Sequence, residues 1–214
     1  MITFHIISLF TDSFSYLNQS MLGRAIKRGK IKIKIYNLRD FANDKHKTTD
    51  DKPYGGGPGM VLKAEPIIKA VQKIKKNKKR VKIIALSADG DMFTNTHART
   101  LAKNSTHIVL IAGHYEGVDA RVAKILKAEK ISVGQYIVTG GELPAMIVVD
   151  AVARQIPGVL GTLESIEEKR IASPEVYTRP EILVYKKKKY RVPKVLLSGN
   201  HKKIEEWRAK KYAR

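Results

Sequence analysis

One stretch of the chain concentrates glycine in a pattern that suits close contact with a ligand. Residues 50–60 read Asp-Asp-Lys-Pro-Tyr-Gly-Gly-Gly-Pro-Gly-Met, with four glycines in five consecutive positions. Glycine permits positive φ and close backbone approach, so this segment could hold an anion or a flexible arm of a substrate. It is not a Walker A loop, because no Gly-Lys-Ser/Thr follows. A flexible surface turn is the alternative, equally compatible with the composition.

Two further glycine-containing turns directly follow apolar stretches. Gly113-His-Tyr-Glu-Gly-Val-Asp-Ala-Arg121 follows residues 107–112, and Thr-Gly-Gly141 follows residues 131–138. In open α/β sheets, ligands bind beyond the carboxyl ends of the strands. Glu116 could therefore accept a hydrogen bond from a base or a ribose, and the backbone around Gly141 could recognise an adenine edge. Ordinary strand-to-helix turns are the alternative in both places.

Arg154 stands near the end of a predicted helix, beside Gln155-Ile-Pro-Gly-Val-Leu-Gly161. A guanidinium in that position could hold a phosphate or a carbonyl group. The alternative is a cation that complements the carboxyl end of the helix dipole. Several other chemistries lack their signatures: the first strand has no Gly-x-Gly-x-x-Gly after it, no His/Asp/Glu cluster has metal-ligand spacing, and no Gly-x-Ser-x-Gly occurs.

The charge balance indicates a polyanionic partner. The 214 residues include 41 Lys plus Arg and 20 Asp plus Glu, a net charge of +21. Nucleic acid fits that charge, although solubility alone would also explain it. The chain has no cysteine, which excludes disulfides, thiolate metal sites and a cysteine nucleophile. No apolar run reaches the ~18 residues of a membrane span, and the N-terminus lacks signal-peptide features, so we expect a cytoplasmic protein with no membrane partner.

The elements that would position these motifs alternate between strand and helix. Helices are expected from Thr11 or Asp12 to about Gly29 and over 64–76, 95–103, 118–127 and 142–156. Strands are expected over 2–9, 31–35, 81–86, 107–112 and 131–138. This alternation predicts parallel strand pairing and an α/β fold.

The character of the chain changes after Ile156. Residues 157–181 hold three prolines and mixed charges, which is typical of a linker or loop. Residues 182–214 form a short basic segment with a strand-like Ile182–Tyr185, the run Lys186–Lys189 and a helix expected from about Ser198.

Six motifs in this order resemble those of one enzyme family, the bacterial tRNA (guanine-N1)-methyltransferases that modify the guanine at tRNA position 37. Each motif is weak alone, but together they are specific and span nearly the whole chain. The motifs are Pro53-Tyr-Gly-Gly-Gly-Pro-Gly-Met60, Gly113-His-Tyr-Glu-Gly-Val-Asp119, Gly134-Gln-Tyr-Ile-Val-Thr-Gly-Gly-Glu-Leu-Pro-Ala-Met146, Arg154-Gln-Ile-Pro-Gly-Val-Leu-Gly161, Tyr177-Thr-Arg-Pro180 and Val195-Leu-Leu-Ser-Gly199.

The resemblance implies a SPOUT-type α/β domain, with a parallel sheet and a deep trefoil knot, plus a small basic, mostly helical C-terminal annex. The implied divisions are a catalytic domain at 1–160, a linker or lid loop at 161–180 and a tRNA-binding domain at 181–214. It also implies a homodimer with active sites at its interface and S-adenosyl-L-methionine as cofactor. The cofactor-binding positions that it assigns are Leu86, Ser87, Ala88, Gly113, Tyr115, Glu116, Val133, Gly134, Gln135, Tyr136, Ile137, Val138, Gly140, Gly141 and Pro144.

Methylation of guanine N1 requires removal of the proton that N1 carries at neutral pH. The resemblance makes Arg154 the donor that stabilises negative charge on guanine O6. The family uses an Asp as the base in the loop before Tyr177, but this chain has no Asp after Asp150. Glu168 is the favoured replacement and Glu167 the next, with Glu164 also in that loop. A magnesium requirement is implied by the family, whereas the sequence shows no ligand cluster for the metal.

The resemblance implies that the glycine-rich loop and the basic C-terminal segment bind the tRNA anticodon stem-loop. It implies no binding of DNA. Three alternatives stay open: a catalytically decayed RNA-binding protein on the same scaffold, a SPOUT methyltransferase acting on another RNA, and an assembly factor. Phosphate contacts would supply affinity, and a flipped-out base would supply specificity. The tRNA-binding positions assigned are Tyr54, Gly55, Gly56, Gly57, Lys186, Lys187, Arg191, Lys202 and Arg208.

Overall fold

The fold is that of a computed structural model, which describes residues 1–160 and 175–212. The chain divides into two compact units, Met1–Leu160 and Gly161–Arg214. We describe each unit by itself. Within the described ranges, no helix combines the length and the apolarity needed to cross a membrane.

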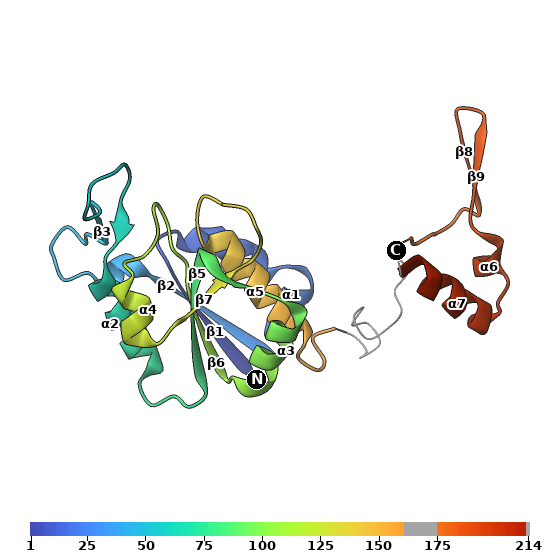
Figure 1. The fold of residues 1–214 in the computed structure, drawn as a ribbon. Coiled ribbons are helices and arrows are strands. Elements are labelled where there is room, and N and C mark those ends of the chain that lie inside the picture. Colours follow the sequence, from blue (N-terminus) through green and yellow to red (C-terminus); the bar gives the residue numbers. More distant parts are fainter. Residues whose placement is uncertain (161–174, 213–214) are drawn as a thin grey trace. The chain divides into compact units, whose positions relative to one another are not determined.

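A five-stranded sheet forms the centre of the first unit (Figure 1). Its strand order is β2-β1-β6-β5-β7, and every pairing in it is parallel. The α/β fold with parallel pairing that the sequence predicts is therefore confirmed. The strands are β1 (Ile2–Ser8), β2 (Ile31–Asn37), β5 (Val81–Met92), β6 (His107–Ile111) and β7 (Glu129–Ser132).

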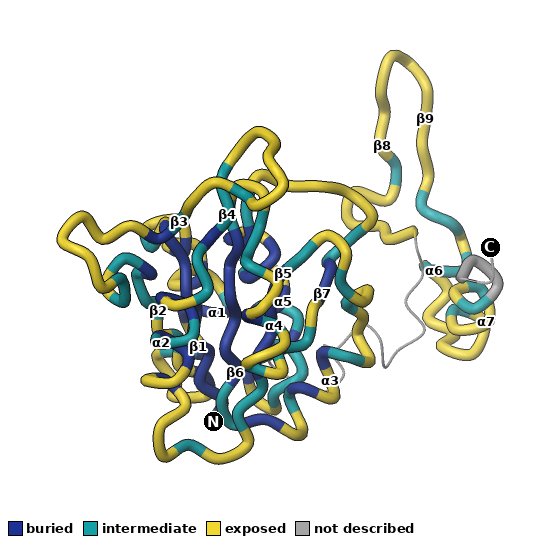
Figure 2. Tube along the Cα trace, turned by 60° about the vertical axis from the view of Figure 1, so that its left-hand side comes forward, coloured by how far each residue is buried: buried dark blue, intermediate teal, exposed yellow. Residues whose placement is uncertain are grey.

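Helices cover both faces of this sheet, and Figure 2 shows buried residues concentrated in the strands between them. Strand β1 explains why both faces need cover: all seven of its residues are buried, and alternate side chains enter opposite cores. One core holds residues from η1 (Thr11–Asn18), α1 (Ser20–Lys27), α3 (Asn95–Asn104) and α5 (Glu142–Arg154). The other holds residues from η2 (Leu38–Phe41), α2 (Ala64–Lys75) and α4 (Arg121–Leu126).

Strand β5 departs from regular pairing where it meets β7. Ile131 of β7 is paired with both Leu86 and Asp91 of β5, so the residues between these two positions loop out of the ladder. A Cβ atom at Gly90 would lie 2.5 Å from the backbone nitrogen of Ile131. Glycine is therefore needed where this loop closes against β7.

Several predicted elements have different bounds in the structure, among them the strand predicted over 81–86, which extends to Met92 as β5. The predicted strand 131–138 ends at Ser132, because the following apolar residues leave the sheet, and Ile137 is 88% exposed. The predicted helix 11–29 is divided into η1 and α1 at Gln19, beside a positive φ at Ser20. Helix α4 begins at Arg121, whose backbone N–H donates to the Asp119 carboxylate.

The glycine-rich stretch is the loop of a small hairpin. Two short strands, β3 (Asp50–Asp51) and β4 (Val61–Leu62), pair antiparallel and bring the two ends of the loop together. Gly55, Gly56 and Gly57 all have positive φ, and a Cβ on any of them would meet nothing within 4 Å. The glycines here serve the backbone conformation and leave the end of the loop open to solvent.

The second unit contains a β-hairpin followed by two helices. Strands β8 (Ile182–Tyr185) and β9 (Lys188–Arg191) pair antiparallel, and α6 (Lys194–Leu197) and α7 (His201–Tyr212) follow. The sequence predicts the first strand but not the second, because the lysine run hides its alternation. The C-terminal helix begins at His201, not at Ser198, since α6 and a turn precede it.

Candidate active site

A cavity of about 720 Å³ opens at the carboxyl ends of β5, β6 and β7. Its walls are residues 85–89 in the irregular part of β5, the loops that follow β6 and β7, and the starts of α4 and α5. The structure brings together all the predicted cofactor-binding residues except Gly134 and Gln135, which are not among the cavity-lining residues. Those that line it are Leu86, Ser87, Ala88, Gly113, Tyr115, Glu116, Val133, Tyr136, Ile137, Val138, Gly140, Gly141 and Pro144.

Two of the cavity loops touch each other through their backbones. The N–H of Gly141 donates to the carbonyl of Gly113 over 2.7 Å, and His114 pairs with Gly140 in an isolated antiparallel bridge. A Cβ on Gly141 would lie 2.7 Å from the Cα of Ala112. Only glycine permits this approach, which closes one side of the cavity.

Glu142 links three segments behind this contact. Its carboxylate accepts a hydrogen bond from the Ser8 hydroxyl over 2.7 Å and lies 3.7 Å from Nδ1 of His114. Glu142 is buried in the first turn of α5, where the positive end of the helix dipole favours a carboxylate. It thus joins the end of β1, the loop after β6 and the start of α5. Sequence reasoning missed Ser8 and Glu142 in this arrangement, because their 134-residue separation carries no motif.

The glycine-rich hairpin is attached to the rim of the same cavity. The backbone N–H of Glu116 donates to the carbonyl of Met60, and that of Leu62 donates to the carbonyl of Gly117. A Cβ on Gly59 would lie 2.5 Å from the Glu116 carboxylate. The base of the hairpin is therefore tied to the loop after β6, while Tyr54 at its end is fully exposed.

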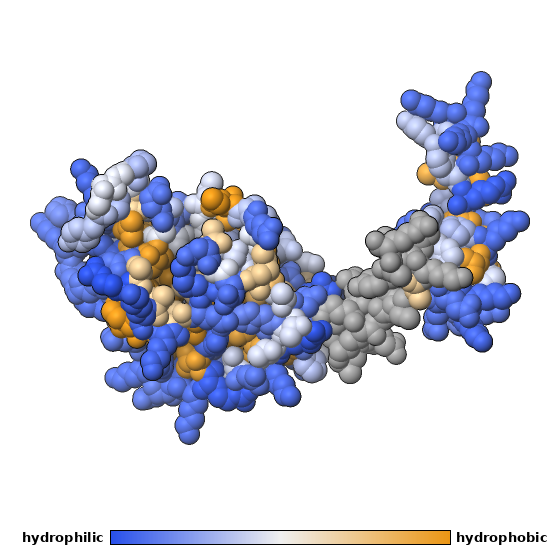
Figure 3. Space-filling model, in the orientation of Figure 1, coloured by the Kyte–Doolittle hydropathy of each residue, from blue (hydrophilic) through white to orange (hydrophobic). Residues whose placement is uncertain are grey.

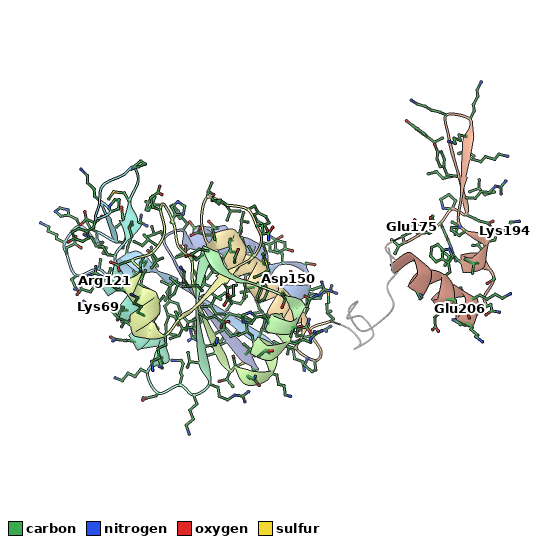
Figure 4. All side chains as sticks on the ribbon, in the orientation of Figure 1. Lys69, Arg121, Asp150, Glu175, Lys194 and Glu206 are labelled. Carbon is green, nitrogen blue, oxygen red and sulfur yellow. The ribbon has the colours of Figure 1, made fainter. Side chains whose placement is uncertain are left out.

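A charged pair marks the α4 side of the cavity. Arg121, labelled in Figure 4, donates hydrogen bonds from Nε and a terminal nitrogen to the Asp119 carboxylate. These bonds lower the pKa of Asp119 and raise the pKa of Arg121. Asp119 is therefore ionised at neutral pH and places a negative charge on the cavity wall.

Arg154 lies away from the cavity of its own chain. It is the last residue of α5, whereas Pro144 near the start of that helix lines the cavity. Ten residues of α-helix separate the two positions by about 15 Å. Glu164, Glu167 and Glu168 lie outside the described residues. Among the described residues, no three His, Asp or Glu side chains form a group that could hold a metal ion.

The predicted tRNA-binding positions are divided between the two units. Tyr54 and the three glycines after it form the exposed hairpin loop of the first unit. In the second unit, Lys186 and Lys187 form the turn between β8 and β9. The remaining basic residues of this set are also exposed: Arg191, Lys202 and Arg208.

The fold and the cavity define an α/β protein that presents a loop-lined ligand site beyond the carboxyl ends of parallel strands. The family model described as tRNA (Guanine-1)-methyltransferase TrmD matches residues 2–214. The chain therefore belongs to the tRNA (guanine-1)-methyltransferase family.

Close relatives support the same family. A protein from Carboxydothermus hydrogenoformans is 48% identical over 210 residues, which are 96% of this chain and 80% of the relative. Another from Dictyoglomus turgidum is 47% identical over 215 residues, covering 98% and 84% of the two chains. A third from Pseudoalteromonas atlantica is 46% identical over 213 residues, covering 97% and 78%. All three are named tRNA (guanine-N(1)-)-methyltransferase.

Proposed function

We propose that this enzyme, a tRNA guanine-N1 methyltransferase by family, transfers a methyl group from S-adenosyl-L-methionine to N1 of the guanine at tRNA position 37. The observation that carries the proposal is the cavity: loops around Leu86, Gly113 and Gly141 meet there, although they are far apart in the sequence. These are the loops that the family resemblance assigns to the cofactor. A cytoplasmic location accompanies this proposal.

The residues of the cavity fit a nucleoside cofactor. Its volume of about 720 Å³ falls within the usual range for small-molecule sites. Gly141 approaches the backbone of Ala112 and Gly113, and Gly140 beside it also lacks a Cβ, so peptide groups on that wall can face a flat ring. Ala88 and Pro144 add apolar surface. When bound, S-adenosyl-L-methionine supplies a methyl group activated by its sulfonium centre.

A deep trefoil knot is part of the proposal. Two features support it: β7 pairs with both arms of the β5 loop, and the segment after β7 returns to lie against Ala112 and Gly113. A knot of this kind would bring these segments of the chain into contact.

A homodimer with shared active sites also belongs to the proposal. On α5, the exposed side chains of Leu143 and Ile147 lie on one stripe with Asp150, labelled in Figure 4, and Arg154, because these positions are three or four residues apart. Figure 3 shows a second apolar surface at the tip of the loop between β7 and α5, where Ile137 is exposed. Exposed apolar surface of this kind is typical of protein interfaces. A partner seated on this stripe would bring its Arg154 toward the cavity of the first chain.

The chemistry requires a base that accepts the N1 proton of the guanine and a hydrogen-bond donor to its O6 atom. In the proposal, Arg154 donates to O6 and stabilises the negative charge that develops there. Glu168, or Glu167 beside it, accepts the N1 proton as the methyl group arrives. Magnesium, which the family implies, is not assigned to any of these residues.

Single-turnover methyl transfer to an unmodified tRNA transcript with guanine at positions 36 and 37, followed across pH, tests this function. We expect the wild type to be active and Glu168→Gln to lose orders of magnitude, whereas a loss in Glu167→Gln alone would make Glu167 the base. If both variants stay active, the base lies elsewhere. An inactive wild type would overturn the proposal and favour a decayed scaffold or another RNA substrate.

A further inference from the structure

The hairpin of the second unit presents an aromatic face that stays exposed among the described residues of that unit, 175–212. Leu183 lies opposite Tyr190 and Tyr185 lies opposite Lys188 in the antiparallel register. Directly opposite residues and residues two apart share a face, so these four side chains lie on one side of the hairpin. Tyr185 is 60% exposed and Tyr190 is 48% exposed.

Both tyrosine rings are already in contact with positive charge. The ammonium group of Lys186 lies 5.5 Å from the ring centre of Tyr185, and that of Lys188 lies 5.5 Å from the ring centre of Tyr190. Figure 3 shows the hairpin with hydrophobic side chains set among hydrophilic ones. The face therefore combines flat aromatic rings with lysine ammonium groups that are able to bind a phosphate.

The turn between the strands has lysine at two positions where this residue type is unusual. Lys186 and Lys187 both have positive φ, at 45° and 62°, the conformation that two-residue hairpin turns fill most easily with Asn-Gly. Lysine is strained there compared with glycine. Local conformation therefore does not explain the two lysines, whereas two ammonium groups at the tip serve binding of an anionic partner.

We propose that the Tyr185–Tyr190 face stacks an unpaired base of the RNA substrate, while the turn lysines hold its phosphates. Proteins bind unpaired nucleotides with aromatic side chains that lie next to lysines, because every base has a flat face and every nucleotide carries a phosphate. An apolar protein partner suits this surface less well, since four consecutive lysines, residues 186–189, separate the two tyrosines and Arg191 follows the second. The inference rests on the proposed action on tRNA and adds the kind of nucleotide that this surface binds.

Equilibrium binding of the full chain to unmodified tRNA, measured by fluorescence anisotropy without cofactor, tests the stacking surface. We expect Tyr185→Ala and Tyr190→Ala each to weaken binding roughly tenfold, because stacking on a base contributes about 1–3 kcal/mol. Tyr185→Phe and Tyr190→Phe retain the ring and should bind within about twofold of the wild type. Val184→Ala, on the opposite face of the hairpin, is the matched control and should also bind normally.

Two further measurements separate stacking from charge and from folding. Replacing the turn by Lys186→Asn with Lys187→Gly should preserve the hairpin and lower the slope of log K against log salt by roughly 1–2. The tyrosine variants should leave that slope unchanged. They should bind fully paired RNA of equal length with the same affinity as the wild type. The thermal unfolding midpoint of each variant gives the control for folding.

The outcomes distinguish this inference from the proposed function. If the wild type methylates tRNA but both alanine variants bind it as tightly as the phenylalanine variants, the stacking surface is wrong. Equal losses of affinity for paired and for unpaired RNA in the alanine variants would also overturn it. If the wild type binds tRNA in a tyrosine-dependent manner but does not methylate it, the proposed function fails and the stacking surface stands.

Discussion

Gly141 shows how a single missing side chain shapes the cavity. A Cβ at this position would lie 2.7 Å from both the Cα of Ala112 and the nitrogen of Gly113, which are backbone atoms that cannot rotate away. We expect Gly141→Ala to separate the two loops, to cost about 1–3 kcal/mol of unfolding free energy through overpacking and to weaken cofactor binding. Calorimetric titration and urea unfolding would measure both effects.

Gly113→Ala is the matched control for that prediction. Its nearest contact would be a methyl group of Val118 at 3.3 Å, which can shift slightly, and the position has no positive φ. We therefore expect a much smaller loss at Gly113 than at Gly141. Equal losses at both positions would show that the close backbone contact is not what shapes this wall.

At the scale of elements, the Ser8–Glu142 hydrogen bond joins β1 to α5. The bond is buried and its acceptor is a carboxylate, so Ser8→Ala should cost about 1.5–3 kcal/mol of stability. Ser13→Ala, at an exposed position in η1, should change stability by less than about 0.5 kcal/mol. Urea unfolding of both variants provides the comparison, and equal stabilities would rule out a structural role for this bond.

Three neighbouring strands share a buried histidine contact. A ring nitrogen of His5 on β1 lies 3.0 Å from the Tyr36 hydroxyl on β2, and the other lies 3.1 Å from Nδ1 of His107 on β6. Burial lowers the pKa of His5 to about 4, with further lowering by His107, Lys78 and Lys34. The unfolded chain, with a pKa of 6.5 at this residue, therefore binds more protons than the folded chain between pH 6.5 and 4.

Stability should consequently fall as the pH drops through that window. The contribution of His5 to this loss is about 2 kcal/mol between pH 7.5 and 5, and none arises above pH 7.5. His5→Asn should remove most of this dependence, whereas His46→Gln at an exposed position should retain it. Urea unfolding at the two pH values measures the difference. If His5→Asn and the wild type lose the same unfolding free energy between the two pH values, the attribution of this loss to His5 is wrong.

The elements were predictable to different degrees, for physical reasons. Strands such as Ile31–Asn37 alternate with period two, and helices such as Ala64–Lys75 have a clear apolar side, so local pattern was sufficient. The predicted strand 131–138 extended too far beyond Ser132, because an apolar run also suits a cavity wall. Strand β9 was missed because lysines occupy its exposed positions. The strand order could not be predicted, since it depends on pairings between distant segments.

The candidate site was predicted through its glycine-containing turns. Gly113, Glu116 and Gly141 follow apolar strands, and parallel sheets bring such ends together. The Ser8–Glu142 hydrogen bond was out of reach, because only the folded chain brings residues 134 positions apart into contact. The position of Arg154 at the end of a helix was predicted from the local pattern, whereas its role as the O6 donor came from the resemblance alone.

At the scale of the whole molecule, shared active sites can be tested by mixing two inactive variants. Arg154→Ala removes the proposed O6 donor, and Ala88→Trp fills the cavity at an exposed lining position. In random dimers, half are mixed and each mixed dimer has one intact site, so about a quarter of wild-type activity should return. No recovery in dimers formed by co-refolding would show that each chain uses its own arginine.

The central place of β1 has a consequence for how the chain is made. Residues 2–8 are synthesised before β6, yet β1 pairs with β6, whose residues 107–111 follow about a hundred positions later. At roughly 5–20 residues per second, the unpaired edge of this largely apolar strand waits several seconds for its second neighbour. During that time it can pair with other nascent chains, which makes early synthesis the stage at which aggregation is most readily started. Strand β1 is thus covered on both sides only after β6 has been made.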